Sequence, residues 1–194
     1  MNKLGSELYE KTGISLRLIM LRDLPNEMNI VQYQEKVIQE FSGPTILLTF
    51  AELNGKVDIM ANEPSLYEYF KKKQVLSPVA STAQAIAMAI FFADDVEDFQ
   101  DLLKYSGGTI LPLLANKTKA GKHVGKYSAA MYNGYLDIGE QIAKSKDVSL
   151  SMATGDSSEN IIFGIKIIFY SIILLAIFMI VKNKFFLKGK EVEV

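Results

Sequence analysis

The chain has 194 residues, of which 49% are hydrophobic and 22% are charged, a composition typical of one compact domain with an appendage. The 21 basic and 22 acidic residues give a net charge of -1, and residues 1–160 carry 20 acids against 16 bases, so a nucleic-acid partner is not expected. Cysteine is absent and His123 is the single histidine, which excludes disulfides and thiolate metal sites and makes any zinc site or Ser-His-Asp triad depend on one residue.

The first 60 residues alternate between helical and strand patterns. In chain order they predict a helix over residues 4–11, a strand over 14–21, an amphipathic helix over 30–41, a buried strand over 45–53 and a further strand over 56–60. Asn54-Gly55 joins the last two strands, and this dipeptide favours a two-residue type I′ turn between antiparallel strands. The order predicts an α/β fold with a mixed central sheet covered by helices.

Three further helices are predicted between Pro64 and the C-terminal apolar run. Residues 65–74 form a helix with exposed lysines. Residues 79–93 are small or apolar but too few to span a bilayer, so we interpret them as a core helix rather than a second membrane pass. The last helix covers residues 127–144, and its predicted packing stripe consists of Ala130, Met131, Gly134, Ile138 and Ile142.

An acidic group follows the predicted core helix. Asp94, Asp95, Asp98 and Asp101 fall at spacings that place several carboxylates on one helical face. Hard cations such as Ca²⁺ or Mg²⁺ bind oxygen clusters of this kind, so these four residues are the candidate metal ligands. The group lacks the loop pattern of an EF-hand, and the acidic first turn of a solvated helix explains it equally well.

A lysine-rich loop precedes the helix over 127–144. Lys117, Lys119, Lys122 and Lys126 are candidates for binding a phosphate or an anionic lipid headgroup. His123 lies among them and has a near-neutral reference pKa, which suits a general acid or base. Because the loop lacks the Walker spacing, a solvated connection is the competing interpretation, and no residue is assigned a catalytic role.

The strongest local signal is the apolar run over residues 161–181. At about 1.5 Å per residue, this run would extend about 31 Å as a helix, close to the hydrocarbon thickness of a bilayer. Lys166 is its only charge, and its long side chain can reach the headgroups. A buried helix of a soluble domain is the alternative. The predicted organisation is a domain over residues 1–145, a polar linker over 146–160, one transmembrane helix over 161–181 and a tail over 182–194, basic and then acidic.

Charge predicts the orientation of this helix. Lys182 and Lys184 begin a lysine-rich stretch after the apolar run, whereas acidic residues precede the apolar run. The positive-inside rule then places the C-terminus in the cytoplasm and the domain outside, with a single pass through the inner (cytoplasmic) membrane of a bacterium. Residues 1–13 have no apolar core of signal-peptide length. Either a signal segment precedes them, which we favour, or the protein is tail-anchored with its domain in the cytoplasm.

The order of several motifs resembles the TPM domain family. These motifs are ISLRLIML, GPTILLTFAELNGKVDIMAN, ILPLL and KYSAAMYNGYLDIGEQIA, within residues 4–145. The resemblance implies an α/β/α sandwich, usually outside the cytoplasm and held by a C-terminal membrane helix, that acts in the upkeep or regulation of membrane complexes. A phosphatase activity is attributed to the plant branch. The chain departs from the family at residues 61–64, where a glycine is expected, and over residues 77–108, which have little counterpart.

Three functions follow from these patterns, and the third, a purely structural subunit of an envelope assembly, is not separated from the first by the sequence. The first is a membrane-anchored, noncatalytic interaction domain that supports the assembly, upkeep or regulation of a membrane complex, with the lipid bilayer and another membrane protein as partners. The alternative is a metal-dependent phosphatase of the TPM type, using Ca²⁺ or Mg²⁺. An enzyme requires acids or a histidine that converge in one pocket, whereas an interaction domain requires an exposed apolar patch.

Overall fold

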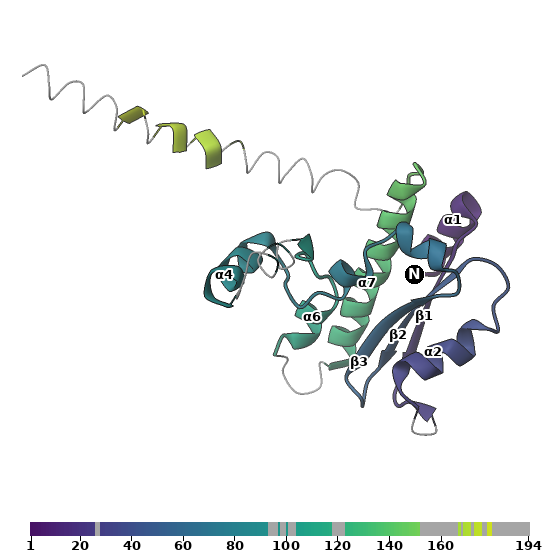
Figure 1. Cartoon of the computed structure of the whole chain (residues 1–194). Helices are drawn as coiled ribbons and strands as arrows, with labels where there is room; N and C mark the ends of the chain where they lie inside the picture. Colours follow the sequence, from purple (N-terminus) through teal and green to yellow (C-terminus); the bar gives the residue numbers. More distant parts are fainter. Residues whose placement is uncertain are drawn as a thin grey trace, which may run out of the picture. The chain divides into compact units, whose positions relative to one another are not determined.

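The computed structural model describes residues 1–25, 28–92, 97, 100, 104–117, 123–151, 167, 169–171, 173–175 and 178–179. The chain divides into two compact units, Met1–Ala153 and Thr154–Val194. The sheet and the helices labelled in Figure 1 belong to the first unit. This unit contains the candidate functional site.

A three-stranded mixed sheet, in the order β1-β2-β3, forms the centre of the first unit. β1 (Ser15–Leu21) pairs in parallel with β2 (Thr45–Ala51), and β2 pairs antiparallel with β3 (Lys56–Ala61). β2 is buried along its whole length because it has a strand on each side and helices above and below. The prediction of an α/β fold with a mixed sheet is confirmed.

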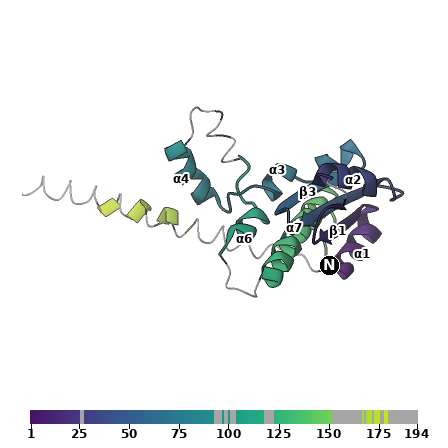
Figure 2. The ribbon, with the colours of Figure 1, turned by 90° about the horizontal axis from the view of Figure 1, so that it is seen from below.

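Helices cover both faces of this sheet, as Figure 2 shows from below. α2 (Ile30–Ile38) packs against β2 and β3 and buries every fourth residue, Ile30, Gln34 and Ile38. α1 (Asn2–Thr12) and α7 (His123–Ser145) pack together next to β1. The main hydrophobic core lies between these two helices and the sheet, and its fully buried side chains include Leu4, Leu8, Ile46, Leu48, Ile59, Ile110, Met131, Ile138 and Ile142.

Local sequence signals fix the ends of the first two helices. Gly13 follows α1 in a left-handed conformation, with φ of 72°, and its N–H donates to the carbonyl of Tyr9. Asn29 and Gln32 form a reciprocal capping box at the start of α2. The N–H of Ser15, at the start of β1, donates to the carbonyl of Pro44, which places β1 beside the α2–β2 connection.

The hairpin between β2 and β3 forms as predicted, but its turn differs. Ala51 is opposite Lys56, so four residues form the connection rather than two. Gly55 has φ of 58°, whereas Asn54 has no positive φ, so the type I′ prediction is wrong. The reason lies in the neighbouring strand: the N–H groups of Glu52 and Leu53 donate to β1 and its continuation, so the turn closes only afterwards, where the N–H of Gly55 donates to the carbonyl of Glu52.

The region after the hairpin departs most from the prediction. The single helix expected over residues 65–74 is split into η2 (Pro64–Glu68), a 3-10 helix, and the short α3 (Lys72–Val75). The break occurs where the N–H of Lys71 donates to the side chain of Gln141 on α7, 2.8 Å away. α4 (Thr82–Phe92) is helical, but residues 82–84, 86 and 87 are exposed, so the core-helix prediction is wrong for them.

α6 (Leu111–Ala115) and α7 complete the first unit. The five residues of the predicted packing stripe on α7 are all buried, which confirms that prediction. Gly134 allows a close approach to the start of α6, because a Cβ built on it would overlap the side chain of Ile110. Residues 148–151 pack back against the domain, and Leu150 is 6% exposed.

The second unit is described at only part of the predicted membrane span. At the described positions between 167 and 179 the chain is helical, and its apolar side chains are exposed. Among the residues that the structure describes, no helix is both long and apolar enough to cross a membrane. Most of residues 161–181 lie outside that part of the chain, as do Lys166, Lys182 and Lys184.

Candidate functional site

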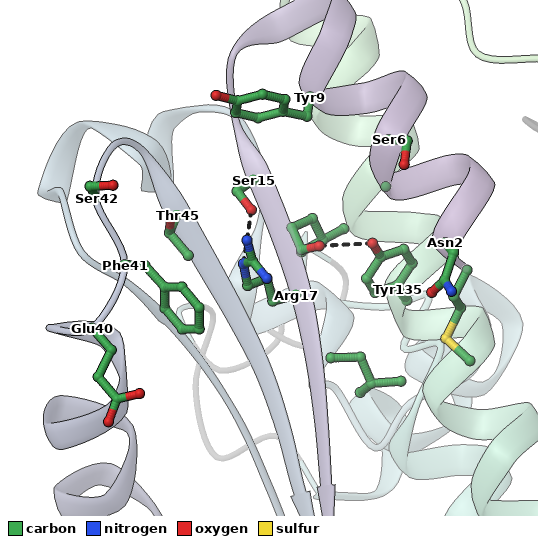
Figure 3. Close-up of a pocket in the computed structure, with 14 residues that line it drawn as sticks. Asn2, Ser6, Tyr9, Ser15, Arg17, Glu40, Phe41, Ser42, Thr45 and Tyr135 are labelled. Carbon is green, nitrogen blue, oxygen red and sulfur yellow. Dashed lines mark hydrogen bonds between the residues drawn. The ribbon is translucent and has the colours of Figure 1, made fainter.

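A groove of about 840 Å³ runs along the outer side of β1 (Figure 3). α1 forms one wall of the groove, and the connection from α2 to β2 forms the other. Its polar lining consists mainly of hydroxyl groups, and Arg17 and Glu40 are charged side chains in it. The residues that supply these groups are Asn2, Ser6, Tyr9, Ser15, Arg17, Glu40, Ser42, Thr45 and Tyr135.

β1 presents an unpaired edge next to this groove, because β2 is its only strand partner in the part of the chain that the structure describes. The N–H of Ser15 donates to Pro44, and the carbonyl of Leu21 accepts from Glu52, so the odd-numbered residues of β1 direct their backbone groups toward β2. The N–H and C=O groups of successive residues alternate in direction along a strand, so those of the even-numbered residues point away from β2, toward the open edge of the sheet. Among the described residues, the N–H and C=O groups of Leu18 and Met20 have no hydrogen-bond partner.

Tyr135 of α7 closes the N-terminal part of the same edge. Its hydroxyl donates a hydrogen bond of 2.8 Å to the carbonyl of Leu16. Gly5 of α1 lies close by, since a Cβ on Gly5 would contact the Tyr135 hydroxyl. Burial raises the pKa of Tyr135, and the opposing effect of the Arg17 charge is smaller. Tyr135 therefore stays a neutral donor, and the accessible edge begins after Leu16.

Arg17 lies on the other side of β1 from Tyr135, as Figure 3 shows. Its Nε donates to the hydroxyl of Ser15 at 3.1 Å, and its guanidinium lies over the ring of Phe41, 4.5 Å from the centroid. No carboxylate of the described residues forms an ion pair with Arg17, although Glu40 also lines the groove. The stacked guanidinium is thus held in place with donors left for a carboxylate or a phosphate.

A second polar cluster stabilises the fold rather than the groove. Asp137 of α7 accepts hydrogen bonds from Thr109 at 3.0 Å and from Gln141 at 2.9 Å. Gln141 also donates to Gln74, whose own amide donates to the carbonyl of Gly107. Burial raises the pKa of Asp137, and the hydrogen bonds from Gln141 and Thr109 only partly offset it. This network fastens α3 and residues 107–109 to α7.

The predicted metal ligands Asp94, Asp95, Asp98 and Asp101 lie outside the described residues. Within the described ranges, no group of three or more Asp, Glu or His side chains is arranged to hold a metal ion. The four acids therefore remain a prediction.

The predicted anion-binding loop is described in part. Lys119 and Lys122 lie outside the described residues, and Lys117 ends the stretch before them. Lys126 donates to the carbonyls of Leu114, at 2.8 Å, and Asn116, at 3.3 Å, so its ammonium group caps the C-terminal end of α6. His123 begins α7, and its side chain is outside the described part of the chain.

The groove was not predicted from the sequence. Arg17 reads as an outward-facing residue of a strand, and nothing local shows that this strand lies at the edge of the sheet. No protein-family model, no curated protein and no solved structure matches this chain. Residues 15–21 contain one arginine and no proline or lysine, so they also lack the residues that commonly mark an edge strand.

Proposed function

We propose that the chain is a membrane-anchored, noncatalytic interaction domain that supports the assembly, upkeep or regulation of a membrane complex. The observation that carries this proposal is the unpaired edge of β1 beside the groove. Exposed edges are normally covered or blunted by charge, proline or bulges, because their free N–H and C=O groups invite pairing. Leu18 presents such groups beside a cavity large enough for a peptide segment, and Met20 presents them further along the same edge.

The proposed anchor is the apolar helix over residues 161–181. Its described side chains include Phe169, Leu174, Leu175, Phe178 and Met179, which are 59–70% exposed. Large apolar side chains on consecutive turns are stable when lipid or protein covers them, and the length of the run suits lipid. In this proposal the single helix passes through the inner membrane, with the domain outside and the lysines after Val181 in the cytoplasm.

Membership of the TPM domain family and its α/β/α sandwich are part of the same proposal. Supporting this proposal are the packing of α2 on one face of the sheet and of α1 with α7 on the other. The order of strand, helix, strand and hairpin strand over residues 15–61 also matches the order of the motifs that carry the resemblance.

Site-specific photocrosslinking in intact membranes tests the interaction. A benzophenone amino acid replaces Ser42, an exposed residue that lines the groove, or Ser65, an exposed serine of η2 that does not line it. We expect a discrete crosslinked product from position 42 and none from position 65, and we expect Arg17→Glu to diminish the product. Equal products from both positions, or no product from position 42, would contradict the proposal.

A phosphate-release assay separates this proposal from the phosphatase alternative. The full chain is incubated with a generic phosphomonoester, with and without Ca²⁺ or Mg²⁺. Phosphoryl transfer requires a metal or cations positioned at the transferred group, so activity would depend on the candidate metal ligands. Metal-dependent turnover that disappears when Asp94, Asp95 and Asp98 are changed to Ala would contradict the noncatalytic proposal and support the phosphatase. We expect no such turnover.

A further inference from the structure

The unpaired part of β1 has the properties of a strand that receives another strand. The seven residues Ser15–Leu21 contain one charge and no proline, bulge or lysine that would discourage pairing. Tyr135 and α1 occupy the edge at Leu16, so pairing is available from Leu18 to Met20. An added segment could exchange backbone hydrogen bonds with both residues, as in β-strand addition.

Charge defines the class of segment that fits. A residue of an added strand that lies beside Arg17 would project on the same face of the sheet, about 5 Å away. The Arg17 guanidinium is fixed by Phe41 and Ser15 and lacks an ion pair among the described residues. A carboxylate at that position of the segment would accept two hydrogen bonds from it. A lysine there would face the guanidinium and be repelled.

We propose that the groove binds an extended, acidic peptide segment of a partner protein, which pairs with β1 as a fourth strand and places a carboxylate against Arg17. This inference rests on the proposed function and names the chemistry of the partner. A second copy of this chain is a poorer occupant: in an antiparallel pair of β1 strands, both Arg17 side chains would lie on one face, and the paired segments contain no carboxylate.

Peptide binding to the full chain in detergent tests this inference. The probes are fluorescent eight-residue peptides of alternating Thr and Val with a central Asp or, as a control, a central Lys. We expect the Asp peptide to bind about tenfold more tightly or better, because a bidentate ion pair replaces a repulsion. Every second amide of the bound peptide faces β1, and the others face away. We therefore expect N-methylation of one alternate set of peptide amides to abolish binding and N-methylation of the other set to leave binding intact.

Charge reversal provides the matched variants. Arg17→Glu should reverse the preference toward the Lys peptide, whereas Arg22→Glu, at the other arginine of the chain and outside the groove lining, should leave it unchanged. Circular dichroism establishes that both variants are folded. The inference would be overturned if the Asp and Lys peptides bound with equal affinity, or if methylating either alternate set of amides left peptide binding unchanged.

Two further outcomes separate this inference from the proposed function. If the peptides fail to bind while Ser42 still crosslinks to a partner, the interaction domain stands and strand addition is wrong. If sedimentation of the full chain in detergent shows a dimer that Arg17→Glu dissociates, and the Asp peptide does not compete, the occupant is a second copy and the inference is overturned.

Discussion

Glu7 binds Ser151 across 144 positions of the sequence. Oε1 of Glu7 accepts the backbone N–H of Ser151 at 2.8 Å, and Oε2 accepts its hydroxyl at 2.6 Å. Lys11 joins them by an ion pair to Glu7 at 2.8 Å and a hydrogen bond to the carbonyl of Ser149. α1 therefore holds the last residues of the first unit in place before the chain continues to the proposed anchor.

This contact predicts an acid-dependent stability. Hydrogen bonds from Lys11 and then from Ser151 lower the pKa of Glu7 from 4.5 to about 2. A depressed pKa in the folded state means that the stabilisation is present above pH 4.5 and is lost as the pH falls toward 2. Glu7→Gln should flatten the dependence of Tm on pH in that window, and Glu10→Gln, a neighbouring acid on α1, should not. Identical pH profiles for Glu7→Gln and the unmodified chain would contradict the assignment.

The raised pKa of Asp137 predicts a pH dependence of stability with the opposite sign. Its pKa is raised by burial, so the folded state favours the protonated carboxyl. The stabilisation is full below the ordinary aspartate value of 3.8 and is lost as the pH rises through the raised pKa. Asp137→Asn should remove this loss and leave stability at neutral pH equal or higher. Chemical denaturation at several pH values measures the effect, with Asp147→Asn at an exposed position as the control. A large destabilisation by Asp137→Asn at neutral pH would contradict this prediction, because it would show that the folded state requires the charged carboxylate.

Gly125 and Gly134, two of the three glycines of α7, should respond to alanine in opposite directions. A Cβ on Gly134 would overlap Ile110, so Gly134→Ala should lower the free energy of unfolding by about 1–3 kcal/mol. A Cβ on Gly125 meets nothing within 4 Å, so Gly125→Ala should raise it by about 0.5–1 kcal/mol. Urea denaturation measures both. Adding Ile110→Ala to Gly134→Ala should cost less than the sum of the single changes, and strict additivity would argue against the close approach.

Much of the fold could be predicted because its signals are local. The alternation of Leu16 and Leu18 on β1, the capping residues Asn29 and Gln32, and the spacing of the α7 stripe each reflect neighbours within one element. The errors have a different cause. The split between η2 and α3 depends on Gln141, which is 70 positions away from Lys71 in the sequence. The groove likewise depends on strand order, because Arg17 becomes a site residue only when β1 lies at the edge.

Gln34 is a polar residue at a buried position of α2, between the apolar residues Ile30 and Ile38 of the same helical face. Its side chain is fully buried between α2 and the sheet, where Nε2 donates to Thr49 at 3.0 Å and to the carbonyl of Asp58 at 3.1 Å. Its Oε1 has no hydrogen-bond partner among the described residues, which is unfavourable in a buried position.

Replacing this polar pair should therefore stabilise the protein. Gln34→Met combined with Thr49→Val keeps the volume and removes the unpaired Oε1. The carbonyl of Asp58 loses its donor but is only part-buried, so the free energy of unfolding should rise by up to about 1 kcal/mol. Gln34→Ala leaves a cavity and should lower the free energy by about 2 kcal/mol or more. Thermal and urea denaturation of the full chain give both values. A strongly destabilised double variant would mean that Oε1 is satisfied in solution.

The edge of β1 offers the most direct test of the interaction domain. Amide hydrogen exchange at Leu18 and Met20 is measured in the full chain within its native membranes and in the same chain purified in detergent, with fragmentation that resolves single residues. We predict that both amides exchange more slowly in the native membrane, where the partner pairs with them. The amides of Arg17 and Ile19, which face β2, should be equally protected in both preparations. Rapid exchange at Leu18 and Met20 in both preparations would contradict the account.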